Sequence, residues 1–379
     1  MVTPWKPQSN LRRDISIVRR TTTPNIPVPV TSTDAELLQG DLPERSGRVH
    51  AYASTERGVH GMPLAEAVRR VAAAVRSGIT ESERDDARYF VWIDVAAPGE
   101  GEVELLRDEL GFHPLAVEDC IKGRQRPKIE RYTGHYFLVI YAGNINKERD
   151  RASFNELHMF IGNGFIVTVR DHRIEQVRDT LARWRVAPAR YPSVGAIAHA
   201  LLDDIVDEYF PIVDHFSEQV SGAESRMVEV GEQFDVQHVH ELRRQIILFR
   251  RVVAPERDII SRLVRRDLPF LSPELVPYFQ DVRDHLIRIV EEIDTLRELV
   301  GTTLEGYASE SAHQLNRTMR KMAAWSIILM SMNLIASNYG MNFDFMPELA
   351  WAAGYPLTVA TMLVVGSVLG YFFWKKKWL

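Results

Sequence analysis

Two long stretches toward the end of the chain carry no charged residue. They run from Met322 to Phe343 and from Leu349 to Trp374 and hold 22 and 26 residues. Because about 20 apolar residues of an α-helix cross a hydrocarbon core of about 30 Å, each stretch is long enough to span a bilayer. The pattern predicts membrane helices at 322–341 and 356–374, with a loop at 342–355 between them. The alternative, two buried helices of a soluble domain, is rare for runs so close together.

Basic residues flank this pair of stretches and predict how it crosses the membrane. Positive charges cluster before the first stretch and after the second, whereas the loop carries only Asp344 and Glu348. By the positive-inside rule, the soluble part and the basic tail at 375–379 lie in the cytoplasm and the loop lies outside. Residues 1–10 contain no apolar run of the signal-peptide type. We therefore expect a multi-pass protein of the cell inner (plasma) membrane with both termini cytoplasmic.

The first stretch is the more polar of the two, and polar and methionine residues fall near one stripe of its helix. They are Asn316, Met319, Met330, Asn333 and Ser337, at spacings of 3, 11, 3 and 4. Such a stripe either holds helices together or lines a pore. Because two spans per chain cannot enclose a pore, a conduction path needs several copies of this helix. Neither stretch contains an acid, a base or a histidine, so a permeating ion meets only neutral oxygens.

A long helix precedes and includes the first stretch. A serine and a proline before Glu274 are typical of a helix start, and no proline occurs between Pro277 and Pro347. A continuous helix from Glu274 to about Tyr339 holds 66 residues and measures roughly 99 Å, which is too long for a compact domain. The pattern therefore predicts a stalk that runs into the membrane.

Mixed-charge helices are also predicted just upstream of the stalk. They cover Val194–Glu229 and Asp235–Arg266, with kinks expected at Pro211 and Pro255. Together with the stalk they form an expected helical layer at 191–321.

The pattern changes to short alternations between residues 48 and 190, which predicts a compact α/β domain. Residues 1–47 are rich in proline and are expected to form a disordered extension. The expected strands are Tyr89–Val95, Tyr136–Tyr141, Leu157–Ile161 and Phe165–Val169, and the expected helices are Leu64–Ser77 and Glu102–Leu110.

Composition excludes several classes of function. The net charge of −5 gives no basic excess for nucleic-acid binding. The single cysteine, Cys120, excludes an internal disulfide and a cysteine-based zinc site. The chain lacks a nucleotide-binding glycine fingerprint, an HExxH motif and a GxSxG motif, so we expect no enzyme.

A short motif at the end of the first stretch is more specific. Gly340, Met341 and Asn342 are followed closely by Met-Pro-Glu-Leu at 346–349. With the two C-terminal spans, this motif resembles the CorA family of magnesium channels, and the resemblance covers the chain from about residue 88 onward. Further segments also resemble the family: His113-Pro114-Leu115, Glu118-Asp119, Gln125-Arg126-Pro127-Lys128 and Tyr278-Phe279-Gln280-Asp281-Val282-Arg283-Asp284-His285.

The resemblance implies an α+β membrane protein that forms a funnel-shaped homopentamer with an N-terminal cytoplasmic domain, a helical stalk and a pore lined by the first span. It implies influx of Mg²⁺ down the membrane potential, gated by cytoplasmic Mg²⁺, with the lipid bilayer and other copies of the chain as partners, and no other protein partner can be inferred. The filter would be Gly340, Met341 and Asn342, and the stripe residues match pore-lining positions. Asn333 stands where members often have threonine, and Ser331 where many have proline.

The chemistry of the motif agrees with that implication. Gly340 can adopt a positive φ and end the helix, which would turn its last carbonyls toward the axis. Asn342 adds a neutral amide oxygen per subunit. Mg²⁺ releases its water reluctantly, so a ring of neutral oxygens suits the hydrated ion, while Asp344 and Glu348 concentrate cations at the mouth. The simpler alternative is a helix cap followed by a turn.

The resemblance also implies regulatory Mg²⁺ sites between neighbouring subunits. Their carboxylates would come from Glu118 and Asp119 in the loop after His113-Pro114-Leu115, from Asp203, and from Asp281 near the start of the stalk. Taken without the resemblance, each is an ordinary solvated surface acid.

Two other functions stay open at this point. A sister transporter for Zn²⁺, Co²⁺ or Ni²⁺ would share the fold, although the spans lack the cysteine and histidine of a soft-metal site. A membrane-anchored helical scaffold or sensor without a pore would instead be expected to have a first span as apolar as the second.

Overall fold

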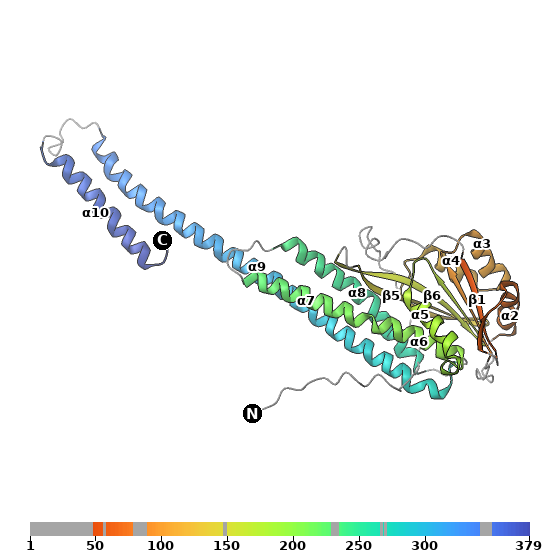
Figure 1. The fold of residues 1–379 in the computed structure, drawn as a ribbon. Coiled ribbons are helices and arrows are strands. Elements are labelled where there is room, and N and C mark those ends of the chain that lie inside the picture. The colour runs from red at the N-terminus through yellow and green to blue at the C-terminus, as the bar shows by residue number, and fades with distance from the viewer. Residues whose placement is uncertain are drawn as a thin grey trace, which may run out of the picture. The chain divides into compact units, whose positions relative to one another are not determined.

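The chain divides into two compact units, with the boundary between Val300 and Gly301 (Figure 1). The expected extension at 1–47 and the loop residues Asn342, Asp344 and Glu348 lie outside the described residues. The computed structural model describes residues 48–55, 58–78, 89–146, 150–228, 235–265, 268, 271–341 and 351–379.

The first unit is built on a seven-stranded sheet with the order β2-β1-β3-β7-β6-β5-β4. β3 and β7 are parallel, and every other neighbouring pair is antiparallel. Every residue of β3 and β7 is buried, as expected for central strands that are covered on both faces. The strands are β1 (Arg48–Thr55), β2 (Gly58–Gly61), β3 (Val91–Ala96), β4 (Lys128–Tyr132), β5 (His135–Asn146), β6 (Arg151–Gly162) and β7 (Phe165–Arg170).

Helices cover both faces of this sheet. The helices of this unit before α9 are α2 (Leu64–Ser77), α3 (Glu100–Glu104), the π-helical turn η1 (Leu105–Glu109), α4 (Pro114–Lys122), α5 (Glu175–Val186), the 3₁₀ turn η2 (Pro188–Arg190), α6 (Val194–Asp207), α7 (Tyr209–Val228) and α8 (Val236–Leu263). On one face, α2, η1 and α4 share a core with Val91 and Ile93 of β3. Trp92, between them in the strand, faces the other way and contacts Trp184 of α5. α6 packs beside α5 and against β5 and β7, and α7 and α8 continue that layer (Figure 1).

The first part of α9 (Val276–Tyr339) packs within this unit along one stripe. Successive members of the stripe are three or four residues apart, which keeps them on one side of a helix. This regular repeat ends at Val300, where the first unit ends. The buried residues of the stripe are Phe279, Val282, Leu286, Ile289, Ile293, Leu296 and Val300.

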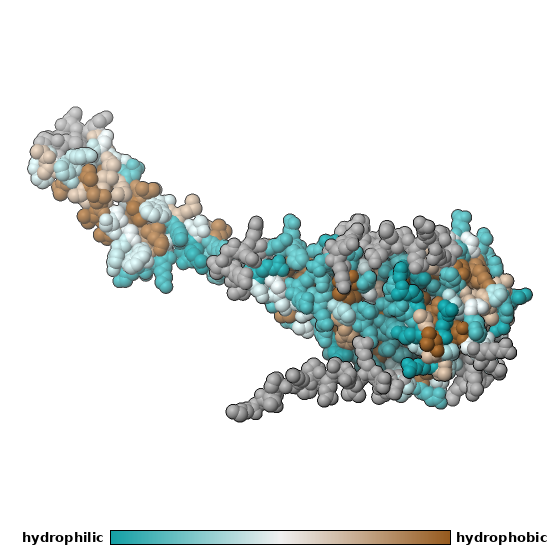
Figure 2. Space-filling model, viewed as in Figure 1, coloured by the Kyte–Doolittle hydropathy of each residue, from teal (hydrophilic) through white to brown (hydrophobic). Residues whose placement is uncertain are grey.

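The second unit contains the rest of α9 and α10 (Gly354–Lys375), which pack against each other. Ala324 and Ile328 of α9 form a small core with Phe373 of α10, and Met332 packs against it. Gly366 of α10 lies close to Met332, because a Cβ atom there would be 3.2 Å from the methionine Cε. The rest of both helices exposes many large apolar side chains, as Figure 2 shows, which is typical of a surface that other molecules cover.

By length and composition, α10 is the one helix in the described part of the chain that is apolar enough to cross a membrane. The serines and asparagines of α9 lower its hydropathy.

The predicted strands and one of the predicted helices are confirmed. β3 and β7 lie close to the predicted bounds, β5 and β6 contain the predicted strands but are about twice as long, and α2 has the predicted bounds. β1, β2 and β4 were not predicted. They lie at or beside the sheet edges and carry polar residues on their exposed sides, so their hydrophobic pattern is weak.

Three predicted helices need correction. The helix expected at 102–110 is α3 followed by η1. The helix expected at Val194–Glu229 breaks at Glu208, because Pro211 falls in the first turn of α7, where no helical N–H is required. α8 continues through Pro255, and α9 begins at Val276 after a 3₁₀ turn, η3 (Pro273–Leu275).

A buried polar network joins β5 and β6 to α7 and α8. The Glu256 carboxylate of α8 accepts hydrogen bonds from the Tyr141 backbone N–H, at 2.8 Å, and from the Tyr209 hydroxyl, at 2.8 Å. The Glu156 carboxyl group is hydrogen-bonded to the Tyr141 hydroxyl. Burial raises the pKa of Glu256 to about 8 and the pKa of Glu156 to about 7. Both carboxyl groups therefore hold protons in the folded protein at pH values where unfolded glutamate is ionised.

We expect the folded protein to lose stability as the pH rises from 6.5 to 8. The folded state then binds more protons than the unfolded state, so the free energy of unfolding falls, by up to about 1.4 kcal/mol per pH unit for each group. Burial lowers the pKa values of His135 and His158 to about 4. These histidines make the free energy of unfolding rise with pH, but only below pH 6.5, so they do not oppose the effect in this window. Thermal melting across this window measures the effect.

Glu256→Gln should flatten this pH dependence, because the amide resembles the protonated acid. Glu66→Gln, at an exposed position on α2, is the matched control and should keep the wild-type profile. A wild-type melting temperature that stays level or rises between pH 6.5 and 8 would contradict the assignment.

Candidate cation path and metal sites

The five stripe residues all lie on α9 and are exposed within the second unit. Met319 is 62% exposed and Met330 is 74% exposed. The α10 contact lies on the opposite side of the helix, because at about 100° per residue Ala324, Ile328 and Met332 face roughly away from Met319 and Ser337. The structure therefore brings the stripe together on the side of α9 that α10 leaves uncovered.

The end of α9 differs from the sequence expectation. The helix ends at Tyr339, and the Gly340 N–H donates to the Ser337 carbonyl at 3.1 Å. Gly340 is not among the glycines with a positive φ, so the prediction of a left-handed helix end is wrong. A tightened last turn satisfies the Ser337 carbonyl instead of freeing it. Met341 is half-exposed, and Asn342 of the expected filter lies outside the described residues.

Glu118 and Asp119 lie on α4 rather than in a loop, which corrects the sequence interpretation. Pro114 stands at the start of this helix, and the His113 ring nitrogen accepts a hydrogen bond from the Leu115 N–H. Both acids already have cationic neighbours. Glu118 pairs with Lys122 one turn later, and Asp119 Oδ2 lies 2.6 Å from Lys128 Nζ. A metal ion at Asp119 would have to compete with Lys128.

The other two predicted acids lie where α6 approaches α9. Asp203 of α6 lies 3.7 Å from the His199 ring, and Asp281 of α9 lies 3.9 Å from His285. Burial opposes ionisation of Asp203, but its hydrogen bond with His199 and the nearby histidine charges hold its pKa below the ordinary value. His285 also lies 3.5 Å from Asp207, and that contact raises the pKa of His285.

The two pairs of acids do not converge within one chain. α4 and α6 belong to layers on opposite faces of the sheet. Among the described residues, no group of three or more histidine, cysteine or acidic side chains could hold a metal ion.

Comparison with known proteins identifies the family of this chain. The family model described as CorA-like Mg²⁺ transporter protein matches residues 87–377. The chain belongs to this family. Members of the CorA family are transporters of divalent cations and not enzymes, in agreement with both expectations from the sequence.

Relatives of this CorA-family chain extend over most of its length. It is 30% identical over 298 residues to the cobalt/magnesium transport protein CorA of Thermotoga maritima, which covers 78% of this chain and 85% of the relative. The solved structure of the CorA magnesium transporter from Methanocaldococcus jannaschii has a TM-score of 0.71 at 18% identity and covers 89% of this chain and all of that one. The full-length CmaX protein has a TM-score of 0.67 at 19% identity. These two likenesses show a shared fold.

Sequence reasoning missed the cations that accompany the predicted acids. Lys122 follows Glu118 by one helical turn, so a charge pattern could have revealed that pair. Lys128 reaches Asp119 from β4, and Asp207 of α6 meets His285 of α9, so both contacts depend on tertiary structure.

Proposed function

We propose that this CorA-family chain assembles as a homopentamer and conducts divalent cations, chiefly Mg²⁺, into the cell. Five copies of α9 would line one axial pathway, with the soluble part cytoplasmic and α10 as the second membrane span. A membrane potential favours entry of a divalent cation by about 4.6 kcal/mol per 100 mV, so inward movement needs no chemical coupling.

The observation that carries this proposal is the uncovered polar stripe of α9. Asn316, Asn333 and Ser337 provide neutral oxygens on the face opposite α10, and Met319 and Met330 would narrow the pathway between them. Neutral acceptors bind a hydrated cation without the strong trapping that a carboxylate ring produces. Gly340, Met341 and Asn342 complete the proposed filter, with Asp344 and Glu348 at the outer mouth.

We propose cytoplasmic Mg²⁺ as the gating ligand. Asp119 and Glu118 of one subunit would meet Asp281 and Asp203 of the next. The separation of these acids on two faces of the sheet supports a site shared between copies.

Metal uptake by liposomes that hold the purified full-length protein tests the function. We expect uptake of Mg²⁺ to rise with an inside-negative potential and to be reduced by competing Co²⁺. Zn²⁺ should compete weakly, because no cysteine or histidine lies in either expected span.

The outcome also separates the alternatives. Preferred uptake of Zn²⁺, Co²⁺ or Ni²⁺ would favour the sister transporter. No uptake of any cation by correctly assembled protein would favour the scaffold or sensor.

A further inference from the structure

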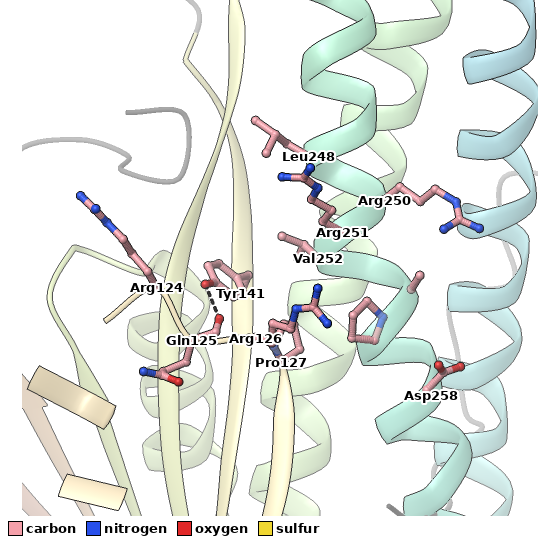
Figure 3. Close-up of a pocket in the computed structure, with 12 residues that line it drawn as sticks. Arg124, Gln125, Arg126, Pro127, Tyr141, Leu248, Arg250, Arg251, Val252 and Asp258 are labelled. Carbon is pink, nitrogen blue, oxygen red and sulfur yellow. Dashed lines mark hydrogen bonds between the residues drawn. The ribbon is translucent and has the colours of Figure 1, made fainter. Parts of the chain in front are cut away.

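A cavity of about 250 Å³ lies in the first unit, between the loop that follows α4 and the middle of α8 (Figure 3). Neither the proposed cation path nor the proposed metal sites include this cavity. One wall is apolar and is formed by Pro127 of the loop and by Leu248, Val252 and Pro255 of α8. Arg126 and Arg251 also line the cavity, one from each side. The cavity thus combines an apolar wall with two guanidinium groups.

The four arginines around this cavity differ in direction (Figure 3). Arg126 points from the loop toward α8, and Arg251 lies on the side of α8 that faces the loop. Arg250 points the other way, toward α9, where its Nε lies 2.7 Å from Asp294 Oδ1, and Arg124 points away from α8. Within the described part of the chain, the Arg126 side chain forms no ion pair or hydrogen bond. Its positive charge is available to a ligand.

The loop that carries Arg126 is held in place by buried groups. Gly123 and Arg124 both have a positive φ, 58° and 57°, which turns the chain sharply after α4. The Gln125 N–H donates to Glu156, and the Gln125 carbonyl accepts a hydrogen bond from the Tyr141 hydroxyl at 2.6 Å. Because the backbone on which Arg126 stands is fixed, a ligand there has to order the Arg126 side chain but not the loop.

These features define the chemical class of the ligand. Guanidinium groups form paired, charge-assisted hydrogen bonds with phosphate oxygens. Asp258, also at the cavity, lies 2.8 Å from Arg257 and so has a cation of its own. A cavity of this size approaches the roughly 300–1,000 Å³ of small-molecule sites and exceeds what one inorganic anion fills. The apolar wall suits an uncharged group attached to the phosphate.

We propose that this cavity binds a mononucleotide. The phosphate lies between Arg126 and Arg251, and the base packs against Leu248, Val252 and Pro255. Recognition by side-chain guanidinium groups needs no glycine-rich phosphate loop, so the lack of that fingerprint in the sequence does not oppose this site.

Isothermal titration calorimetry on the full-length protein in detergent tests this proposal. The buffer contains EDTA, so that metal binding by either partner makes no contribution, and the ligands are AMP, adenosine and inorganic phosphate. We expect AMP to bind at least about tenfold more tightly than adenosine or phosphate, because only AMP contacts both the apolar wall and the arginines. The measurement needs no transport, so its result is independent of the proposed channel function.

Variants identify the site. Arg126→Gln and Arg251→Gln should each weaken AMP binding about tenfold. Ala254→Leu should also weaken it, because the larger side chain occupies the cavity without changing any charge. Arg107→Gln, an exposed arginine on η1 paired with Asp108, removes the same charge elsewhere and should bind AMP as the wild type does. Absence of AMP binding, phosphate binding as tight as AMP, or an equal loss in Arg107→Gln would each overturn the proposal.

Discussion

Replacing Asn342 by alanine is expected to reduce Mg²⁺ uptake into liposomes by about tenfold or more while the assembly stays intact. Each substitution removes one neutral amide oxygen from the proposed filter, and a hydrogen bond to a charged partner contributes about 1.5–3 kcal/mol. In a homopentamer the loss is repeated in every subunit. Uptake with Mg²⁺ and Co²⁺ in competition measures flux and selectivity together, and size-exclusion chromatography measures assembly.

Asn338→Ala is the matched control for the filter variant. Asn338 is an exposed asparagine on α9, and the helical angle places it about 100° away from Met319 and Ser337. Its uptake should remain within about twofold of the wild type, because its loss removes no acceptor from the pathway. Wild-type flux and selectivity in Asn342→Ala would show that the filter lies elsewhere.

Asp281→Lys is expected to abolish the effect of Mg²⁺ on the protease susceptibility of the cytoplasmic helices. In the proposed gating, Mg²⁺ bound between Asp281 and the next subunit's α4 would neutralise like charges and tighten the interface. We expect Mg²⁺ to slow cleavage about fivefold or more, within the usual range of coupling between sites. A lysine at 281 supplies a fixed positive charge beside Asp119, so the interface stays closed without the metal.

The structure shows why position 281 is suitable for this test. Asp281 is more than half exposed, and it lies 3.9 Å from the His285 ring, so the substitution disturbs little within its own chain. Glu298→Lys makes the same charge change at another exposed position of α9 and should keep the wild-type response. Persistent Mg²⁺ protection in Asp281→Lys would rule out the proposed interface site.

The contacts within one chain also indicate how Mg²⁺ would act at a shared site. Lys128 neutralises Asp119, and His199 stabilises ionised Asp203, so each acid has a partner without metal. A metal ion must bind these carboxylates more strongly than these partners do. Several weak sites that act together can shift the equilibrium where one cannot.

The hydrophobic pattern by itself determined those elements whose residues all lie in one kind of surroundings. The uncharged runs at 322–343 and 349–374 predicted two membrane helices; the structure has the end of α9 and α10 there, and among the described helices α10 is the one apolar enough to cross a membrane. The buried strands β3 and β7 and the central parts of β5 and β6 were equally clear, because most side chains in the predicted segments are apolar. The polar pattern also named the stripe residues of α9 correctly as members of one helical face.

Tertiary structure decided which faces and which charges are available. Periodicity places Asn333 and Ser337 on one side of a helix, but only the contact of Ile328 and Met332 with α10 shows that this side is uncovered. The edge strands β2 and β4, and β1 beside β2, form because neighbouring strands supply their hydrogen bonds, which their own sequences do not reveal.

The same distinction holds for the acids and for the end of α9. Residue type marks Glu118, Asp119, Asp203 and Asp281 as carboxylates, yet their separation on two faces of the sheet follows from the order in which distant strands pair. Gly340 permits a left-handed turn but does not require one, and the hydrogen bond to Ser337 selects the tighter ending. Local sequence limits the conformations that a segment can adopt, and contacts between segments far apart in the chain select among them.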